Sequence, residues 1–366
     1  MAWDKRADMV VHEVEPFNAE PPRSALTGAL TDSSSFYVRN HGPVPETRPG
    51  HWRLTVSGLV DHPLELDLEQ LRDRFEQHDV IATLQCAGNR RAGLTAVRDI
   101  PGEIPWGPGA TSTARWTGVR LADVVQAAGP AAEAEHVAFE APDVSGIADP
   151  AQRFGGSIPI GKARSPEVLL AWAMNGDPLP AVHGAPVRVV VPGYIGARSV
   201  KWLERIVVRE RPSDNFFQAT AYRLLPPEAD PGAAGPGDGI SLGPIALTCD
   251  VTVPDDGATL TAGAVTVRGY AFAGGTRRVA RVDVSPDGGR SWTRARLDDP
   301  AGPWAWTLWH AVVDLPAGPG EILARAWDDT AALQPESAAA LWNPKGYVNN
   351  SWGRVRVTVE PPGQVG

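Results

Sequence analysis

The last third of the chain alternates polar and apolar residues in short runs, and this pattern constrains the fold more than any other feature. Alternation with a period of two is typical of strands that bury one face. The turn-forming stretch Ser285–Gly289 (SPDGG) interrupts one run and predicts a hairpin. Short strands at regular spacing, separated by such turns, predict a β-sandwich. The alternating runs cover residues 259–274, 278–297, 304–315, 321–329 and 354–360.

The first two thirds of the chain show a mixed pattern. The spacing over Leu66–Phe75 and Val119–Gly129 predicts helices, whereas Val80–Cys86 and Val187–Gly193 resemble buried strands. Strands and helices do not alternate regularly, which favours an α+β domain over a doubly wound one. The Pro- and Gly-rich segment 225–243 is a candidate linker. We therefore predict two domains, residues 1–237 and residues 238–366.

Composition and charge exclude several classes of protein. The sequence has 34 Lys and Arg residues against 43 Asp and Glu residues, a net charge of -9, which argues against a nucleic-acid partner. It contains no apolar run long enough to predict a membrane span. The first twenty residues lack the apolar core of a signal peptide, and two cysteines cannot form a disulfide framework for this length. We expect a reduced, cytoplasmic location.

The stretch Thr83–Arg91 (TLQCAGNRR) carries the strongest chemical signal. Cys86 ends an apolar strand pattern, and Arg90 and Arg91 follow closely. Nearby guanidinium groups favour a thiolate, which is a nucleophile and a soft metal ligand. The spacing alone leaves equally open that Cys86 is an inert buried thiol, because free cysteines are commonly buried.

A second stretch, Phe36–Pro45 (FYVRNHGPVP), presents Arg39, Asn40 and His41 beside a Gly-Pro turn. A proline-rich loop is rigid without being helical, which suits fixed contacts to an anionic ligand. The alternative is a solvated loop.

The third stretch, residues 183–202, leads from His183 and Arg188 through a buried strand to Ser199 and Lys201. Glycines, a hydroxyl and cations after a strand are typical of phosphate sites. Neither a P-loop nor a dinucleotide-binding fingerprint is present, so the pattern by itself indicates only a weak anion site.

Together these stretches resemble the sulfite oxidase family of molybdenum enzymes over nearly the whole chain. The matching stretches occur in the family's order and are PFNAEPP (16–22), FYVRNHGPVP (36–45), TLQCAGNRR (83–91), GATSTARWTGVRL (109–121), FGGSIPI (154–160), LLAWAMNG (169–176), HGAPVRVVVPGYIGARSVKWL (183–203) and LWNPKGYVNNSWGRV (341–355). The resemblance implies an α+β molybdopterin domain followed by an immunoglobulin-like β-sandwich, and a homodimer formed through that sandwich.

The resemblance also implies the site. Cys86 would be the one protein thiolate on the metal of a Mo-molybdopterin cofactor, and no haem is expected in this chain. The residues that would bind the cofactor are Arg39, Asn40, His41, Cys86, Asp143, His183, Arg188, Ser199, Val200 and Lys201. The residues that would form the catalytic pocket for a small oxyanion are Arg39, Arg91, Trp106, Trp172 and Lys345.

The reaction implied by the resemblance is oxidation of sulfite to sulfate by oxygen-atom transfer, with electrons passed to an external acceptor, a cytochrome or oxygen. Two positions depart from the family: Trp172 stands where sulfite oxidases usually have Tyr, and Lys345 where they often have Arg. An indole cannot exchange a proton as a phenol does, and Lys lacks the bidentate fork of Arg. The alternative is a reductase of nitrate, of another small oxyanion or of an S-oxide on the same scaffold.

Two rival hypotheses come from other classes. The first is a cofactor-free cysteine hydrolase or transferase that uses Cys86 with His41 or His183 as base, which requires a base within hydrogen-bond reach of the sulfur. The second is a binding protein with an inactive first domain, against which the presence of Cys86, Arg39 and Arg91 argues.

Overall fold

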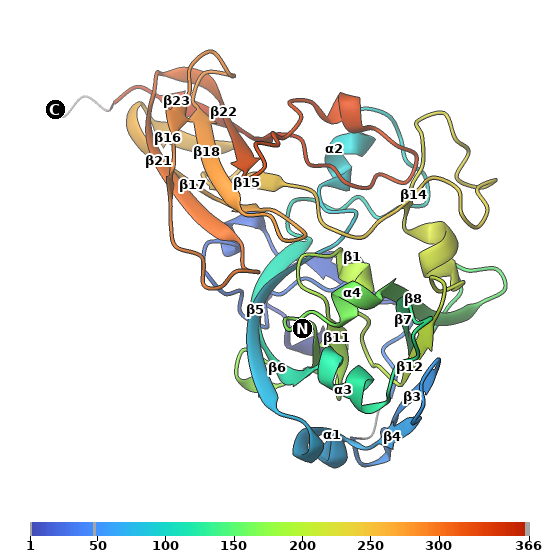
Figure 1. Cartoon of the computed structure of the whole chain (residues 1–366). Coiled ribbons are helices and arrows are strands. Elements are labelled where there is room, and N and C mark those ends of the chain that lie inside the picture. The colour runs from blue at the N-terminus through green and yellow to red at the C-terminus, as the bar shows by residue number, and fades with distance from the viewer. Residues whose placement is uncertain (1, 47–48, 363–366) are drawn as a thin grey trace.

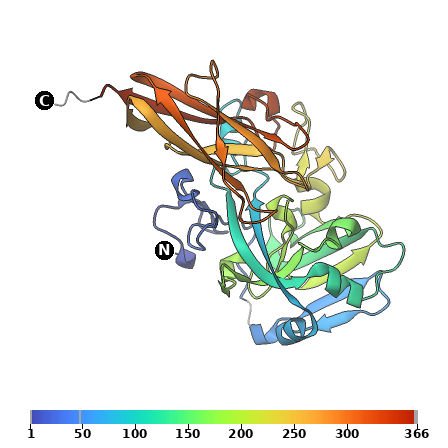
Figure 2. The same ribbon diagram turned by 60° about the vertical axis from the view of Figure 1, so that its left-hand side comes forward.

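The computed structural model describes residues 2–46 and 49–362, and it consists of two β-rich parts that lie against each other (Figure 1). The larger part contains the α-helices and most of the irregular chain. The smaller part, β15 to β23, is an elongated pair of sheets that projects to one side in both views (Figure 2). None of the described helices is long and apolar enough to cross a membrane.

The first sheet of the larger part has the strand order β10-β9-β6-β5, with β11 paired to β9. All of its strand pairs are antiparallel, and β5 and β6 are its longest strands. The predicted strand over Val80–Cys86 corresponds to β5, whose last residue directly precedes Cys86. The bounds are β5 (Gln77–Gln85), β6 (Thr111–Arg120), β9 (Leu169–Met174), β10 (Asp177–Pro178) and β11 (Arg188–Val190).

The second sheet has the order β4-β3-β12-β7-β8. The pair β12–β3 is parallel, and the other pairs are antiparallel. This mixture agrees with the predicted α+β class. The bounds are β3 (Leu54–Gly58), β4 (Leu64–Leu66), β7 (His136–Ser145), β8 (Gln152–Pro159) and β12 (Arg205–Arg209).

The helices of the larger part are short. The predicted helix at Leu66–Phe75 is α1, and it begins at a capping box: the Asp67 carboxylate accepts the Gln70 N–H at 2.8 Å, and the Gln70 side chain accepts the Asp67 N–H at 3.0 Å. The predicted helix at Val119–Gly129 is α3. The bounds are α1 (Leu68–Arg74), α2 (Arg91–Thr95), α3 (Leu121–Ala127) and α4 (Ile160–Ala163).

Strand β9 separates two hydrophobic clusters. Leu169 and Ala171 pack with Cys86, whereas Leu170 and Trp172 belong to the larger core that lies between the two sheets. Successive side chains of a strand point to opposite faces, so neighbouring residues of β9 reach different clusters. The side chains on both faces of β9 are therefore buried in hydrophobic clusters.

The smaller part is a sandwich of two sheets, with the orders β15-β17-β21-β20 and β16-β23-β22-β18-β19. Val251 and Val267 of one sheet pack with Val284 and Val355 of the other in one apolar core. The sandwich was predicted, but the run 259–274 is two strands in different sheets rather than one. The bounds are β15 (Thr248–Val253), β16 (Ala258–Thr261), β17 (Gly263–Phe272), β18 (Val279–Ser285), β19 (Thr293–Arg294), β20 (Arg296–Leu297), β21 (Thr307–Leu315), β22 (Gly318–Asp328) and β23 (Gly353–Glu360).

Two small hairpins complete the fold. Strands β1 (Val10–Glu13) and β2 (Asn18–Glu20) pair near the N-terminus, and β13 (Arg223–Leu224) pairs with β14 (Ile240–Ser241). The Pro- and Gly-rich segment after β13 thus forms the loop of a hairpin before the chain enters the sandwich. A single wide helical turn, Phe217–Ala221, ends immediately before Tyr222.

Candidate active site

A pocket in the larger part brings together every predicted cofactor-binding residue except Val200. The space between its walls, open mouth included, is about 610 Å³. Segments that are far apart in the sequence line it. The polar lining residues are Tyr37, Arg39, Asn40, His41, Cys86, Asp143, His183, Arg188, Ser199, Lys201 and Tyr222.

Cys86 lies at the end of β5, with its thiol in this pocket. Its backbone N–H donates to the Ala110 carbonyl at 2.9 Å, and its sulfur accepts the Gly88 N–H at 3.4 Å. Burial raises the pKa of the thiol, against the opposing effect of Arg91 and Arg39. The described residues contain no group of three or more His, Cys, Asp and Glu side chains arranged to hold a metal ion.

The guanidinium of Arg91 lies in a narrow slot between two glycines. A Cβ at Gly88 would lie 2.6 Å from the Arg91 Nη2 atom, and a Cβ at Gly346 would lie 2.5 Å from its Cγ atom. Gly346 also has a φ of +59°, in the left-handed region that favours glycine. One glycine follows Cys86, and the other comes from the loop before β23, so both parts of the chain shape the slot.

The cations of the pocket bind carbonyl oxygens rather than carboxylates. Arg188 donates to the carbonyls of His183 and Ser199, both at 2.9 Å. Lys201 donates to the Val182 carbonyl at 3.1 Å and to the side-chain oxygen of Asn40. Arg39 donates to the Asn40 carbonyl. Their donor groups thus stay available to an anionic ligand, although burial lowers the pKa of Lys201 well below its ordinary value. Arg188 and Ser199 lie where a phosphate site was predicted.

Asp143 carries the one carboxylate among the described residues that line the pocket. It is 4 % exposed, and its Oδ1 atom has no hydrogen-bond partner. Burial raises the pKa of Asp143 to about 7, although the charge of Lys201 acts in the opposite direction. A buried acceptor without a donor is costly, so this carboxylate is suited to a ligand that supplies N–H groups.

Tyr222 also lines the pocket, although the sequence analysis missed it. Its hydroxyl lies 2.6 Å from the Nε2 atom of His41, whose ring stacks on Phe154 with centroids 4.5 Å apart. Burial lowers the pKa of His41 well below its ordinary value, with Arg39 and Lys201 acting in the same direction. A neutral imidazole and a phenol in contact form a pair that can hold or pass a proton. No pattern in the sequence marks Tyr222, because a one-turn helix from a distant segment brings it to His41.

Lys5 is the second residue that the sequence analysis missed. Its ammonium lies 2.7 Å from the Nε2 atom of His183 and donates to the carbonyls of Ser33 (2.6 Å) and Phe36 (2.8 Å). Burial lowers the pKa of Lys5 to about 7. The N-terminal segment thus supports the His183 side of the pocket.

Replacing Lys5 with methionine should change how stability depends on pH. The folded protein holds the Lys5 proton only below about pH 7, whereas the unfolded chain keeps it to about pH 10.5. Between these values the unfolded state binds more protons, so the free energy of unfolding rises with pH, by at most about 1.4 kcal/mol per pH unit. Urea unfolding at pH 7, 8, 9 and 10 should show this rise for the wild type relative to Lys5→Met. Parallel curves for the two proteins would contradict the lowered pKa of Lys5 in the folded protein.

Three predicted catalytic residues lie beside the pocket rather than in its lining. Arg91 is 3 % exposed and donates to the carbonyls of Lys345 (3.0 Å) and Ile104 (2.8 Å). Trp106 is fully buried in the cluster that contains Cys86, and its indole N–H has no partner. Arg91 and Lys345 both pair with Glu103, a carboxylate that the sequence analysis did not consider.

The structure places the side chains of two further predicted residues outside the pocket lining. Trp172 does not line the pocket: it lies on the face of β9 opposite the Cys86 cluster, and its ring packs under the Arg72 guanidinium at 5.1 Å. The Trp-for-Tyr departure therefore does not alter the pocket. The Val200 side chain is buried in the core, so only its backbone could meet a ligand.

The loop of residues 343–352, which precedes β23 and which we name the C-terminal loop, holds the segment that follows Cys86. The Val348 N–H donates to the Ala87 carbonyl at 2.9 Å. The Asn349 amide donates to the carbonyl of Arg90 at 2.8 Å, and Arg90 adopts a left-handed φ of 64°. Hydrogen bonds from the C-terminal loop thus hold the backbone that follows Cys86.

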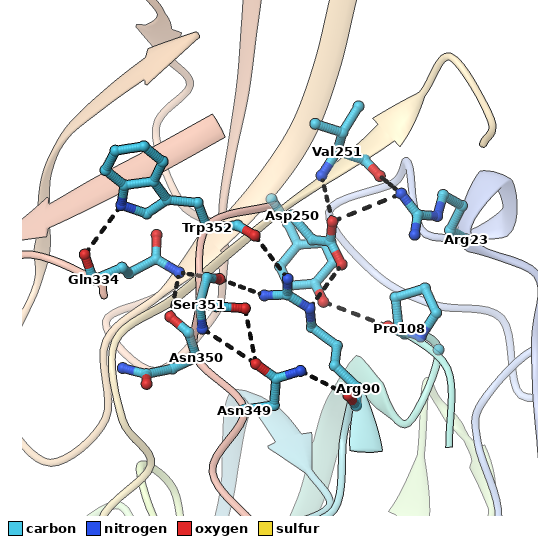
Figure 3. Close-up of polar contacts among 12 residues, drawn as sticks. Arg23, Arg90, Pro108, Asp250, Val251, Gln334, Asn349, Asn350, Ser351 and Trp352 are labelled. Carbon is cyan, nitrogen blue, oxygen red and sulfur yellow. Dashed lines mark hydrogen bonds and ion pairs between the residues drawn. The ribbon is translucent and has the colours of Figure 1, made fainter. Parts of the chain in front are cut away.

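Arg90 is the centre of this contact, as Figure 3 shows. Its guanidinium donates to the carbonyls of Ser351 (2.7 Å) and Trp352 (2.8 Å) and lies 3.5 Å from the carboxylate of Asp250 on β15. Arg23 approaches the same carboxylate at 3.7 Å. Asp250 is 1 % exposed, so the buried charge depends on these two arginines.

Comparison with known proteins identifies the family. Residues 41–217 match the family described as an oxidoreductase molybdopterin binding domain, and residues 244–360 match the one described as a Mo-co oxidoreductase dimerisation domain. The sulfite oxidase of Gallus gallus is 46% identical over 356 residues, which are 94% of this chain and 76% of that protein. The chain belongs to the sulfite oxidase family.

Two further relatives of this sulfite oxidase family member are informative. The mitochondrial sulfite oxidase of Homo sapiens is 44% identical, over 96% of this chain and 66% of that protein. The sulfane dehydrogenase SoxCD of Paracoccus pantotrophus shares the fold with a TM-score of 0.80 at 27% identity, over 96% of this chain and 88% of that one. The predicted family, α+β fold and Mo-molybdopterin oxidoreductase class are confirmed.

The pocket fits the cofactor of the family. A pterin ring carries N–H donors that match the unpartnered Asp143 oxygen, and its phosphate matches Arg188, Lys201 and Ser199. The Cys86 thiol supplies the soft donor that suits molybdenum.

Proposed function

We propose that the protein oxidises sulfite to sulfate by oxygen-atom transfer and passes the electrons to an external acceptor. The observation that carries the proposal is the buried Cys86 in a pocket that is also lined by Arg39, Arg188 and Lys201 and, among the described residues, by one carboxylate. A soft ligand and an excess of cations suit a metal cofactor that meets a small anion. The relationship to sulfite oxidases over most of the chain supports the same reaction.

In this proposal Cys86 is the protein ligand of molybdenum. The groups that hold the pterin and its phosphate are Arg39, Asn40, His41, Asp143, His183, Arg188, Ser199, Lys201 and the backbone of Val200. When bound, the cofactor supplies the oxygen atom that is transferred and takes up two electrons. The protein's share is to position two anionic reactants and offset their repulsion.

The substrate site of the proposal comprises Arg39, Arg91, Trp106 and Lys345. Arginine is suited to the edge of an oxyanion because its planar fork donates two parallel hydrogen bonds. We add Tyr222, whose hydroxyl can hold a proton in contact with the neutral His41. Trp172 is left out because it packs on the other face of β9.

We also propose how the chain is organised and where it works. Residues 1–237 would be the catalytic domain, and residues 238–366 an immunoglobulin-like domain through which two copies form a homodimer. The match to a dimerisation domain supports the second assignment. Both cysteines are free and buried, which supports a reduced, cytoplasmic location. A cytochrome or oxygen would accept the electrons.

Steady-state assays of the cofactor-loaded protein test the reaction. We expect sulfite-dependent reduction of ferricyanide with about one molybdenum per chain, and far slower nitrate-dependent oxidation of a reduced dye. The cations of the pocket favour small anions in general, so the comparison must use kcat/KM for both substrates. Faster nitrate reduction would favour the alternative reductase, and full activity without metal would favour the cysteine hydrolase.

A further inference from the structure

The carboxylate of Glu103 lies between Arg91 and Lys345. These are the two cations of the proposed substrate site that do not line the pocket. The Glu103 Oε2 atom is 3.2 Å from the Arg91 Nη2 atom, and its Oε1 atom is 2.7 Å from the Lys345 Nζ atom. The side chains of Glu103 and Lys345 are 17% and 25% exposed, so the group is half-buried and reaches solvent. A single carboxylate thus pairs with two positive charges at once.

An aromatic path connects this group to the pocket. The Arg91 guanidinium lies over the Tyr347 ring at 5.2 Å, and Tyr347 stacks on Tyr222 with ring centroids 5.5 Å apart. Tyr222 lines the pocket together with Cys86. Burial raises the pKa of Tyr222 and of Tyr347, and the charge of Glu103 acts in the same direction. Glu103 therefore belongs to the electrostatic surroundings of the pocket.

We propose that Glu103 sets the affinity for the substrate as a built-in competitor: its carboxylate occupies Arg91 and Lys345 until a small oxyanion displaces it. This inference rests on the proposed function, because it takes Arg91 and Lys345 as substrate cations. A carboxylate has the charge and the oxygen edge of an oxyanion, so both use the same donors. The cost of displacing Glu103 weakens the binding of every anion that uses these two cations.

Glu103→Gln tests the competition because it removes the charge and keeps the shape. We expect the KM for sulfite and the dissociation constant for sulfate both to fall roughly five-fold, since an ion pair of this exposure is worth about 1 kcal/mol. The matched control is Glu140→Gln, which breaks the exposed pair of Glu140 with Arg205 on the second sheet. The control should leave both constants unchanged.

Sulfate binding is measured by the rise in melting temperature with sulfate at constant ionic strength, so this readout does not depend on turnover. Tighter sulfate binding by Glu103→Gln without any sulfite oxidation would support the competitor and overturn the proposed reaction. Active sulfite oxidation with the same KM and sulfate affinity in both proteins would overturn the competitor alone. If Glu103→Gln does not fold, Glu103→Ala should shift both constants in the same direction.

Discussion

Cys86→Ser should abolish turnover while the protein stays folded. A serine hydroxyl has nearly the shape of the thiol, but it is a hard donor with a much higher pKa, so it is a poor ligand for a soft metal site. Mutating a residue that only hydrogen-bonds to a metal ligand costs about 10- to 100-fold in metal affinity or activity. Loss of the ligand itself should therefore cost more than that. The measurements are kcat with sulfite and the molybdenum content per chain.

Cys249→Ala is the matched control for this substitution. Cys249 is fully buried on β15, in the apolar core of the sandwich, and it lies in a different cluster from Cys86. The control should lose some stability through the small cavity but keep its metal and its turnover. If Cys86→Ser retained activity near that of the wild type, the thiol would not be the ligand.

Arg90→Met should cost more stability than any other single change at the contact between the two parts. It removes the donor to the carbonyls of Ser351 and Trp352 and the nearer of the two cations beside the Asp250 carboxylate. Removing one partner of a buried ion pair costs roughly 3–5 kcal/mol, because the remaining charge is left without compensation. Chemical denaturation of the cofactor-free protein measures the free energy of unfolding directly.

Two further variants separate the charge from the packing. The double variant Arg90→Met with Asp250→Asn removes both charges and should regain part of the lost stability, with a coupling energy that a double-mutant cycle yields. Arg205→Met, at the exposed pair with Glu140, should cost no more than about 1 kcal/mol. Equal losses for Arg90→Met and Arg205→Met would mean that the contact in Figure 3 contributes little.

Local signals in the sequence were sufficient for much of the fold. The alternating runs became strands of the sandwich because one face of each is buried, and α1 formed where Asp67 and Gln70 cap the chain. The run 259–274 was misjudged because alternation continues through residue 262 while the chain moves from one sheet to the other. Alternation shows that one face of a strand is buried, but it does not show to which sheet the strand belongs.

The candidate site was only partly predictable. Arg39, Cys86 and Arg188 stand in motifs whose chemistry is recognisable, and the structure brings them into one pocket. Trp172 was misplaced because a matching stretch does not say which face of its strand is turned to the pocket. Lys5 and Tyr222 were missed because their roles arise from contacts with residues more than 170 positions away along the chain.

The slot around Arg91 limits how this protein can exchange parts with its relatives. Gly88 belongs to the segment after Cys86 and Gly346 to the C-terminal loop, and the guanidinium needs both to lack a side chain. A chimera that receives a sandwich from another member must therefore bring a glycine at the position of Gly346, however well the new sheets fold. The two parts of this chain are consequently not interchangeable modules, because both must leave room for the same guanidinium.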